Sequence, residues 1–540
     1  MMKACRQCHN EFQVFDEDLK FFEKVSPVLS GKKYLISPPT CCPDCRQRRR
    51  LSYRNERNFY KRKCDLSGEN IVSVYSPEFK GKVFSHESFY GDKWDSADFG
   101  RDFDFSRPFF EQFLELSFSS PRLCTVMMNS ENSVYTNHSA YNKNCYMCIN
   151  TGYSEDLLYC TNYNLYNKDC VDCLTIFYCE KCYFCVSATK AYSCTFLYVC
   201  VDVTDCYFCF DCQGCDNCFG CWNLRHKSYC IFNKQYSKDE YEEKLQKLKP
   251  KSWPEQIRMF EGWKKMMEDQ AIHRHLHIEK SINSGGDYLD NCQNVQDSFY
   301  TFGSEDCRYC YDAGKLRDCY DCTEPFNEEL HYELQASFNG YHNLFSLKNL
   351  EAKNTIYCQY CIHSQDCFGC AGMNGGQYRI FNKQYTKEQY EDLAGKIIEH
   401  MKKTGEWGEF FPANHSPFAY NETVAQDFYP ITGQEAAKNG LKWHDETKHV
   451  SGESSGEILK CEVSGRLYRL VPAEIAFYEK MGLPLPARHF EERVKMRLGL
   501  RNPRKLYTTV CGKCSAGIET SCPVGTAKIY CEKCYLEAVY

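Results

Sequence analysis

Cysteine recurs at a fixed interval of 12 residues through the middle of the chain, and this spacing constrains the fold more than any other feature. Twelve is a poor helical period, because three turns of α-helix take about 10.8 residues and four take about 14.4. It suits one coil of a narrow β-solenoid, where equivalent residues stack about 4.8 Å apart and small, soft cysteine side chains fill the interior. A string of small zinc knuckles is the alternative. The series is Cys170, Cys182, Cys194, Cys206, Cys218 and Cys230, and its phase extends backwards through Leu158, Tyr146 and Val134.

The repeat occurs in two copies. The stretch CFGCWNLRHKSYCIFNKQYSKDEY, from Cys218, matches CFGCAGMNGGQYRIFNKQYTKEQY, from Cys367, at a constant offset of 149 residues. Each copy ends in a capping box, at Ser237 and at Thr386, that opens an amphipathic helix. We expect each helix to cover the last coil, because an open end would expose unpaired strand backbone.

The two ends of the chain are copies of a second module. CRQCHNEFQVFDEDLKFFEK, from Cys5, aligns without a gap with CEVSGRLYRLVPAEIAFYEK, from Cys461. We therefore predict a mainly β fold with α-helices, in which duplicated end modules flank two cysteine-rich 12-residue-repeat β-solenoid segments, each capped by a helix. The predicted domains are 1–120 (first end module with a connector helix), 121–250 (first repeat segment with its capping helix), 251–282 (linker helix), 283–398 (second repeat segment with its capping helix), 399–455 (connector) and 456–540 (second end module).

Each end module has two potential four-ligand sites, and each copy keeps a different one. Paired CxxC motifs allow four thiolates to converge on a tetrahedral zinc ion at about 2.3 Å. The other site of the first copy is Cys64 with three serines, and that of the second is Cys461 with Ser464, His489 and Glu492. Neither of these sets suits zinc. The sequence predicts about two zinc ions per chain, at Cys5, Cys8, Cys42 and Cys45 and at Cys511, Cys514, Cys531 and Cys534.

These motifs carry a family resemblance. A CxxC, then F-x-V-x-x-x-D-L-x-F-F, then CPDCR at Cys42 to Arg46, resembles the zinc-ribbon, treble-clef-like domain of cysteine-rich bacterial proteins. With the Cys- and Tyr-rich middle and the two NKQY motifs, the resemblance covers most of the chain. It implies that both end modules are zinc ribbons. It implies no reaction, because that group has no established activity.

The cysteines of the repeat are expected to pack the core rather than to bind metal. Stacked CxxC pairs could form thiolate cages for zinc or for an iron–sulfur cluster. However, the second copy keeps Cys319 and Cys322, whereas His331 and Leu334 replace Cys182 and Cys185 of the first copy. A metal site would be kept or lost as a set. We therefore expect buried thiols, with metal binding and disulfide bonds as the alternatives.

Basic segments adjoin both modules. Residues 43–63 contain nine Lys and Arg against two acids, and residues 488–505 contain seven against two. A zinc module beside a basic, tyrosine-bearing segment is typical of proteins that contact a phosphate backbone. The alternatives are a solvated helix face, or arginines paired with acids elsewhere in the chain. The expected nucleic-acid contacts are Arg46, Arg48, Arg49, Arg50, Arg54, Arg57, Lys61, Arg62, Lys63, Arg497, Arg501, Arg504 and Lys505.

The sequence predicts no catalytic residue. It contains no P-loop, GxGxxG, GxSxG or HExxH motif. No apolar run reaches the roughly 18–20 residues of a membrane span, and the N-terminal MMKACRQC has no apolar signal region, so we expect a cytoplasmic protein without a membrane partner. The net charge of −6 argues against a protein that coats nucleic acid with its whole surface.

The predicted function is a non-enzymatic zinc-binding scaffold that contacts RNA or DNA through the basic segments. One alternative is a protein–protein interaction scaffold built on the solenoid, with its exposed tyrosine and phenylalanine side chains as the contact surface. Another is a thiol-redox or iron–sulfur enzyme.

Overall fold

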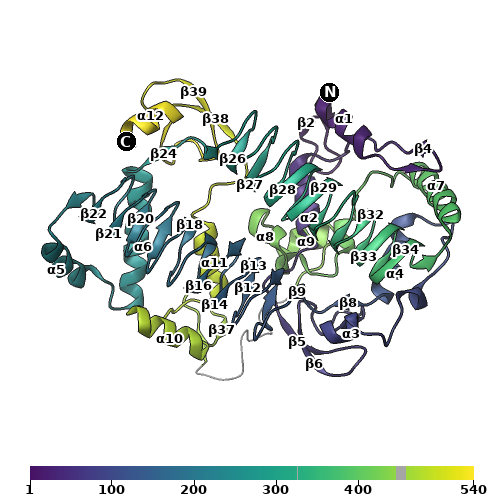
Figure 1. The fold of residues 1–540 in the computed structure, drawn as a ribbon, viewed down its shortest axis with the longest axis horizontal. Helices are drawn as coiled ribbons and strands as arrows, with labels where there is room; N and C mark the ends of the chain where they lie inside the picture. The colour runs from purple at the N-terminus through teal and green to yellow at the C-terminus, as the bar shows by residue number, and fades with distance from the viewer. Residues whose placement is uncertain (325, 445–457) are drawn as a thin grey trace. The chain divides into compact units, whose positions relative to one another are not determined.

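The computed structural model describes residues 1–324, 326–444 and 458–540. The chain divides into two compact units, Met1–Thr125 with Ile278–His444, and Val126–His277 with Asp445–Tyr540. Each unit therefore combines an end module with the repeat segment of the other half of the sequence (Figure 1). The end of the predicted connector, residues 445–455, and the first two residues of the predicted second end module lie outside the described residues.

In the second unit, the first repeat segment is a ladder of parallel strands with a register of 12 residues. Leu197 pairs with Cys209, and Cys218 pairs with Cys230. Antiparallel β23 (Lys234–Gln235) ends the ladder. The parallel strands of the main sheet are β9 (Met127–Met128), β11 (Ser139–Ala140), β13 (Thr151–Gly152), β15 (Asn164–Leu165), β17 (Leu174–Phe177), β18 (Val186–Thr189), β19 (Thr195–Tyr198), β20 (Tyr207–Phe210), β21 (Asp216–Phe219) and β22 (Ser228–Ile231). Two further parallel pairs are β10 (Thr136–Asn137) with β12 (Cys148–Ile149), and β14 (Glu155–Leu158) with β16 (Lys168–Val171).

The register slips once. Leu157, not Leu158, pairs with Cys170, so this coil has 13 residues. Two consecutive residues with left-handed backbone, Asn162 and Tyr163, accommodate the extra residue. The phase predicted for the residues before Cys170 is therefore wrong by one position.

Every third residue of a coil has left-handed backbone geometry, with φ between 51° and 56° at Asp172, Thr175, Tyr178 and Lys181. Each coil thus has four sides of three residues. The inward side chains are also three apart, and those at 170, 173, 176 and 179 are at most 1% exposed. A left-handed backbone costs roughly 1–2 kcal/mol for residues with a Cβ. We infer that the stacking of neighbouring coils, rather than local preference, holds the corners.

In the first unit, the second repeat segment has the same parallel arrangement, with Cys319 paired to His331 and Cys367 to Arg379. Its interior is more polar, because His331 and Thr355 are fully buried at positions that hold cysteine in the first segment. The strands are β25 (Ile278–Glu279), β26 (Gly286–Asp290), β27 (Ser298–Phe302), β28 (Tyr311–Tyr320), β29 (Phe326–Tyr332), β30 (Gln335–Phe338), β31 (Leu347–Leu350), β32 (Lys353–Ile356), β33 (Gln359–Phe368), β34 (Ala371–Ile380) and antiparallel β35 (Lys383–Gln384).

Both predicted capping boxes are confirmed, at the starts of α5 (Lys238–Leu248) and α7 (Lys387–Thr404). Each helix packs against the last parallel strand of its segment. The Tyr241 ring lies 5.7 Å from that of Tyr229, and the Tyr390 ring lies 5.8 Å from that of Tyr378. The predicted linker contains α6 (Trp253–Asp269), which packs against the first repeat segment within the second unit.

The end modules share one order of elements, except that the first has a β3–β4 hairpin between its first two helices and the described residues of the second have none there. The first contains β1 (Met2–Ala4), β2 (Glu11–Gln13), α1 (Asp16–Val25), β3 (Val28–Leu29), β4 (Lys32–Lys33), α2 (Pro43–Leu51), β5 (Tyr60–Lys63), β6 (Asn70–Ser73), β7 (Val83–Phe84) and α3 (His86–Tyr90). The second contains β36 (Leu459–Lys460), β37 (Leu467–Tyr468), α10 (Pro472–Met481), α11 (Phe490–Leu498), β38 (Tyr507–Val510), β39 (Gly517–Thr520), β40 (Lys528–Tyr530) and α12 (Glu532–Val539). The connectors contain α4 (Phe109–Ser119), α8 (Val424–Phe428) and α9 (Gly433–Lys438). None of the helices in the described part of the chain is long and apolar enough to cross a membrane.

Candidate metal centres

The first predicted ligand set forms one cluster. Cys5 and Cys8 lie in the turn between β1 and β2, Cys42 is the N-cap of α2, and Cys45 lies in the first turn of that helix. The four Sγ atoms all lie within 4.8 Å of one another, and those of Cys8 and Cys42 are 3.7 Å apart. A tetrahedron with metal–sulfur bonds of about 2.3 Å has edges of roughly 3.8 Å. The cluster can therefore hold a tetrahedral metal ion.

The second predicted set forms an equivalent cluster at the C-terminal end. Cys511 and Cys514 lie between β38 and β39, Cys531 is the N-cap of α12, and Cys534 lies in its first turn. These Sγ atoms also lie within 4.8 Å of one another, and those of Cys514 and Cys531 are 3.8 Å apart. Both predicted four-cysteine clusters are thus present.

Hydrogen-bond donors stabilise one thiolate in each cluster. The Cys42 N–H donates to Cys5 Sγ at 3.3 Å, and the Cys531 N–H donates to Cys511 Sγ at the same distance. A hydrogen bond from Cys45, opposed by burial, lowers the pKa of Cys42 to about 5. Burial raises the pKa of Cys511, but backbone N–H donors outweigh it and lower the pKa to about 6. The hydrogen bond with Cys42 raises the pKa of Cys45, and burial raises the pKa of Cys534 to about 12, so each cluster has one thiol that ionises readily and others that a bound metal would deprotonate. Four convergent sulfur ligands fit Zn²⁺.

The remaining site of each module, at Cys64 in the first copy and at Cys461 in the second, has lost most of its ligands, and we call these two the degenerate sites. Both keep the backbone geometry of the intact clusters. The Ser85 N–H donates to Cys64 Sγ at 3.3 Å, as the Cys531 N–H does to Cys511 Sγ. At the other site, the Ser464 N–H lies 3.5 Å from Cys461 Sγ. Around Cys64, serine hydroxyls stand where the intact cluster has thiolates. Near Cys461, His489 Nδ1 accepts a hydrogen bond from the Glu491 N–H of α11 at 3.2 Å.

The repeat cysteines are arranged differently. Within the described ranges, no group of three or more of them brings its Sγ atoms together as the terminal clusters do. Their thiols point to backbone carbonyls two residues back and nine residues on. The Cys182 thiol, for example, donates to the carbonyls of Glu180 at 3.3 Å and Ala191 at 3.4 Å. This geometry favours buried thiols over thiolate cages.

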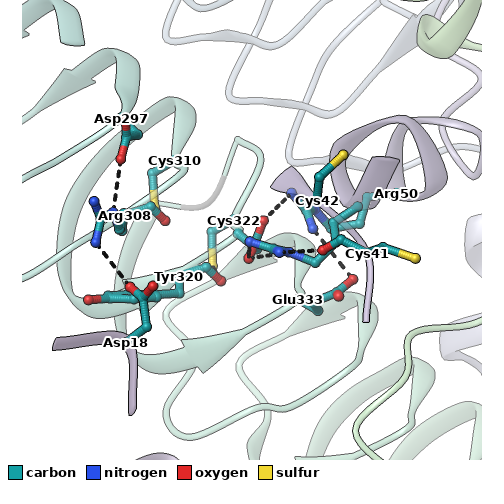
Figure 2. A network of polar contacts seen from close by, with 12 residues as sticks. Asp18, Cys41, Cys42, Arg50, Asp297, Arg308, Cys310, Tyr320, Cys322 and Glu333 are labelled. Carbon is teal, nitrogen blue, oxygen red and sulfur yellow. Dashed lines mark hydrogen bonds and ion pairs between the residues drawn. The ribbon is translucent and has the colours of Figure 1, made fainter. Parts of the chain in front are cut away.

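The basic segment of the first module packs against the second repeat segment. Arg46 Nε and Arg50 Nη2 donate to the two carboxylate oxygens of Asp321, at 2.9 and 3.0 Å. Arg50 also contacts Glu333 at 3.4 Å (Figure 2). Both arginines and both acids are at most 2% exposed. These guanidinium groups therefore have carboxylate partners inside the protein.

The second module repeats this contact with the first repeat segment. Arg493 and Arg497 donate to the two carboxylate oxygens of Asp172, at 2.5 and 2.7 Å. Asp172 and Asp321 lie 149 residues apart, at the same position of the two repeats. Arg493 and both aspartates were not among the predicted site residues, although the 149-residue offset between the repeats also relates the two aspartates.

These contacts change the set of residues available to a nucleic acid. Arg46, Arg50, Arg54 and Arg497 are at most 2% exposed, so no phosphate backbone can reach them in this structure. The prediction that these four arginines contact nucleic acid is wrong, because their side chains are buried where the end modules pack on the coils. Four more have polar or aromatic partners: Arg48 with Tyr420, Arg49 with Glu333 and Glu409, Arg57 with Asp427, and Arg62 with Asp65. Lys61, Lys63 and Lys505 are exposed, and Arg501 and Arg504 are half-buried.

A scan against models of protein families finds no match for the chain, and a search of curated proteins finds no relative.

Proposed function

We propose that the chain is a zinc-binding scaffold in which two zinc-ribbon, treble-clef-like modules each hold one β-solenoid segment. The observation that supports this most directly is the pair of four-cysteine clusters, each built from a turn and a helix N-terminus. The helix that follows Cys42 also supplies the buried arginines that contact the repeat. A zinc ion at Cys5, Cys8, Cys42 and Cys45 would thus fix the start of the helix that packs on the coils.

The surface of the first repeat segment suggests a protein partner. Four tyrosines, which we call the tyrosine row, occupy successive coils at Tyr141, Tyr153, Tyr166 and Tyr178. Neighbouring rings stack at 4.8 to 5.1 Å, and each side chain is 42% to 56% exposed. Tyrosine is enriched in protein interfaces, and contiguous exposed aromatic surface is uncommon elsewhere. We therefore favour the protein-interaction scaffold.

Site-specific photocrosslinking tests this role. A photoreactive phenylalanine analogue at position 153 or 166 is expected to give a discrete protein adduct in cells that produce the full chain. The same analogue at Tyr192, which is 42% exposed but lies outside the row, is the matched control and is expected to give none. Absence of an adduct at the row, or equal adducts at position 192, would contradict the protein partner. An adduct removed by nuclease would favour the nucleic-acid alternative.

A nucleic-acid scaffold is the second candidate, supported by the exposed Lys61 and Lys63 on β5. If these lysines contact phosphates, affinity will fall as salt rises, with a slope of about 0.7 to 0.9 per phosphate neutralised. A Lys61→Glu, Lys63→Glu variant would then bind all sequences more weakly, because phosphate contacts do not distinguish bases.

A further inference from the structure

A cavity of about 650 Å³ lies in the second unit, between α10 and the coils that contain β14 and β16. The first unit offers an internal comparison, because α1 packs on its own coils in the same way. The same ion pair is present in both units. Lys480 Nζ lies 2.5 Å from Asp169 Oδ2, and in the first unit the equivalent Lys24 Nζ lies 2.7 Å from Asp318 Oδ2. The two units therefore have the same backbone frame at this place.

In the first unit, large side chains occupy the equivalent space. The Arg308 guanidinium lies 3.8 Å from the centre of the Phe15 ring and is bound by Asp18 and Asp297 (Figure 2). Beside it, the Phe21 ring stacks on the Tyr320 ring at 3.8 Å. Aromatic rings and two carboxylates thus surround this guanidinium.

The second unit has smaller, uncharged residues at the same positions. On the helix, Val471, Ala473 and Ala476 replace Phe15, Glu17 and Lys20. On the coils, Leu158 and Val171 replace Arg308 and Tyr320, as their identical ladder pairing shows. All five replacements put a smaller side chain on the cavity lining, whereas the Lys480–Asp169 ion pair is kept. These substitutions account for the cavity, whose volume is within the range of about 300–1,000 Å³ typical of small-molecule sites.

The lining of the cavity combines apolar side chains with amide, carboxylate and ammonium groups. Leu158, Val171 and Val471 line it together with Asp156 and Asp169. Lys480 neutralises Asp169, whereas Asp156 receives a hydrogen bond from Asn144 at 3.0 Å and has no cationic nitrogen within 4.0 Å among the residues with described positions. Asp156 is thus a carboxylate on the cavity lining that forms no ion pair, and Lys168 attracts it only from beyond contact distance.

We propose that this cavity binds a small organic cation with an apolar body, an alkylammonium or alkylguanidinium group. The carboxylate of Asp156 would accept hydrogen bonds from the cationic head, and the apolar wall would contact its alkyl part. The first unit holds a group of this chemistry at the equivalent place, namely the Arg308 side chain, although its carboxylate partners there are Asp18 and Asp297 rather than Asp306, the equivalent of Asp156. The ligand is therefore expected to occupy the space that the first unit fills with its own arginine.

Calorimetric titration of the zinc-loaded full chain tests the proposal. Hexylammonium and agmatine are the cationic probes, hexanol and hexanoate are the uncharged and anionic controls, and N-acetylarginine amide represents a peptide side chain. The two cations are expected to bind at least about tenfold more tightly than hexanol, and hexanoate is expected not to bind. Tighter binding of N-acetylarginine amide than of agmatine would assign the site to a peptide arginine, and the reverse order would assign it to a free amine.

Two variants at the cavity and one control in the first unit locate the binding. A Leu158→Arg, Val471→Phe double variant installs the residues of the first unit and is expected to abolish binding of the cations. Asp156→Asn is expected to weaken it at least about tenfold, whereas Asp306→Asn, at the equivalent position of the first unit, is expected to leave it unchanged. Zinc content and circular dichroism equal to those of the wild type show that each variant is folded. The proposal is overturned if no cation binds at millimolar concentration, if hexanol binds as tightly, or if the filled variant binds unchanged.

Discussion

Replacement of Cys8 by serine is expected to release one zinc ion per chain and to unfold the first end module. The strands of this module are short, with three residues each in β1 and β2, so its core is small. Structural zinc contributes about 10–16 kcal/mol in zinc-finger peptides, which matches or exceeds the 5–15 kcal/mol total stability of a typical domain. Loss of one of four ligands should therefore be decisive. Zinc content by mass spectrometry and limited proteolysis of residues 1–60 measure the two effects.

Matched variants separate ligand loss from simple loss of a cysteine. Cys514→Ser should release the other zinc ion and expose the C-terminal module to protease. Cys64→Ser and Cys461→Ser change cysteines at the same position of the degenerate sites, which have hydroxyls or His489 in place of further thiolates. Both should keep the full zinc content. Loss of zinc from either of them would show that the alignment of the module copies is wrong.

Asp321→Ala is expected to reduce the free energy of unfolding of the first unit by about 3–5 kcal/mol, because removal of one partner leaves buried charge uncompensated. Asp321 accepts hydrogen bonds from both Arg46 and Arg50, and none of the three side chains is more than 3% exposed. After its removal, Glu333 would be the nearest acid that still contacts Arg50. Urea denaturation followed by circular dichroism measures the change.

Asp172→Ala should have a similar effect on the second unit, because Asp172 accepts from Arg493 and Arg497 in the same way. Asp392→Asn is the control. It removes an ion pair with Lys396 in which both side chains are more than 60% exposed, and surface pairs of this kind contribute little to stability. If Asp321→Ala is no more destabilising than Asp392→Asn, the buried arginine contacts do not hold the module on the coils.

The parts of the structure that local sequence determines were predictable. The capping boxes at Ser237 and Thr386 depend on residues three apart, and both are present. The predicted metal ligands depend on paired CxxC motifs, and both four-cysteine clusters form. The register of the first repeat segment was predictable from Cys170 towards the C-terminus. Before Cys170 it was not, because one extra residue at Asn162–Tyr163 shifts the phase and no residue type in that coil signals the insertion.

The partners of the arginines were not predictable from local pattern. Arg46 and Asp321 are 275 residues apart, and an arginine-rich helix has the same composition whether its partner is a carboxylate or a phosphate. For the same reason, the sequence does not predict that each end module packs on the repeat segment that is more distant along the chain, because contacts between distant segments leave no periodic pattern. The internal duplications contained the needed information, since the equivalent arginines and the equivalent aspartates recur in both copies.

Metal analysis of the full wild-type chain, purified without added metal, is the most direct test of the zinc scaffold. The account predicts about two zinc ions per chain, negligible iron and no visible absorbance, because only the two terminal clusters offer four convergent thiolates within the described residues. Four or more zinc ions would show that the repeat cysteines bind metal. Iron with sulfide in a brown protein would contradict the scaffold and favour the iron–sulfur alternative.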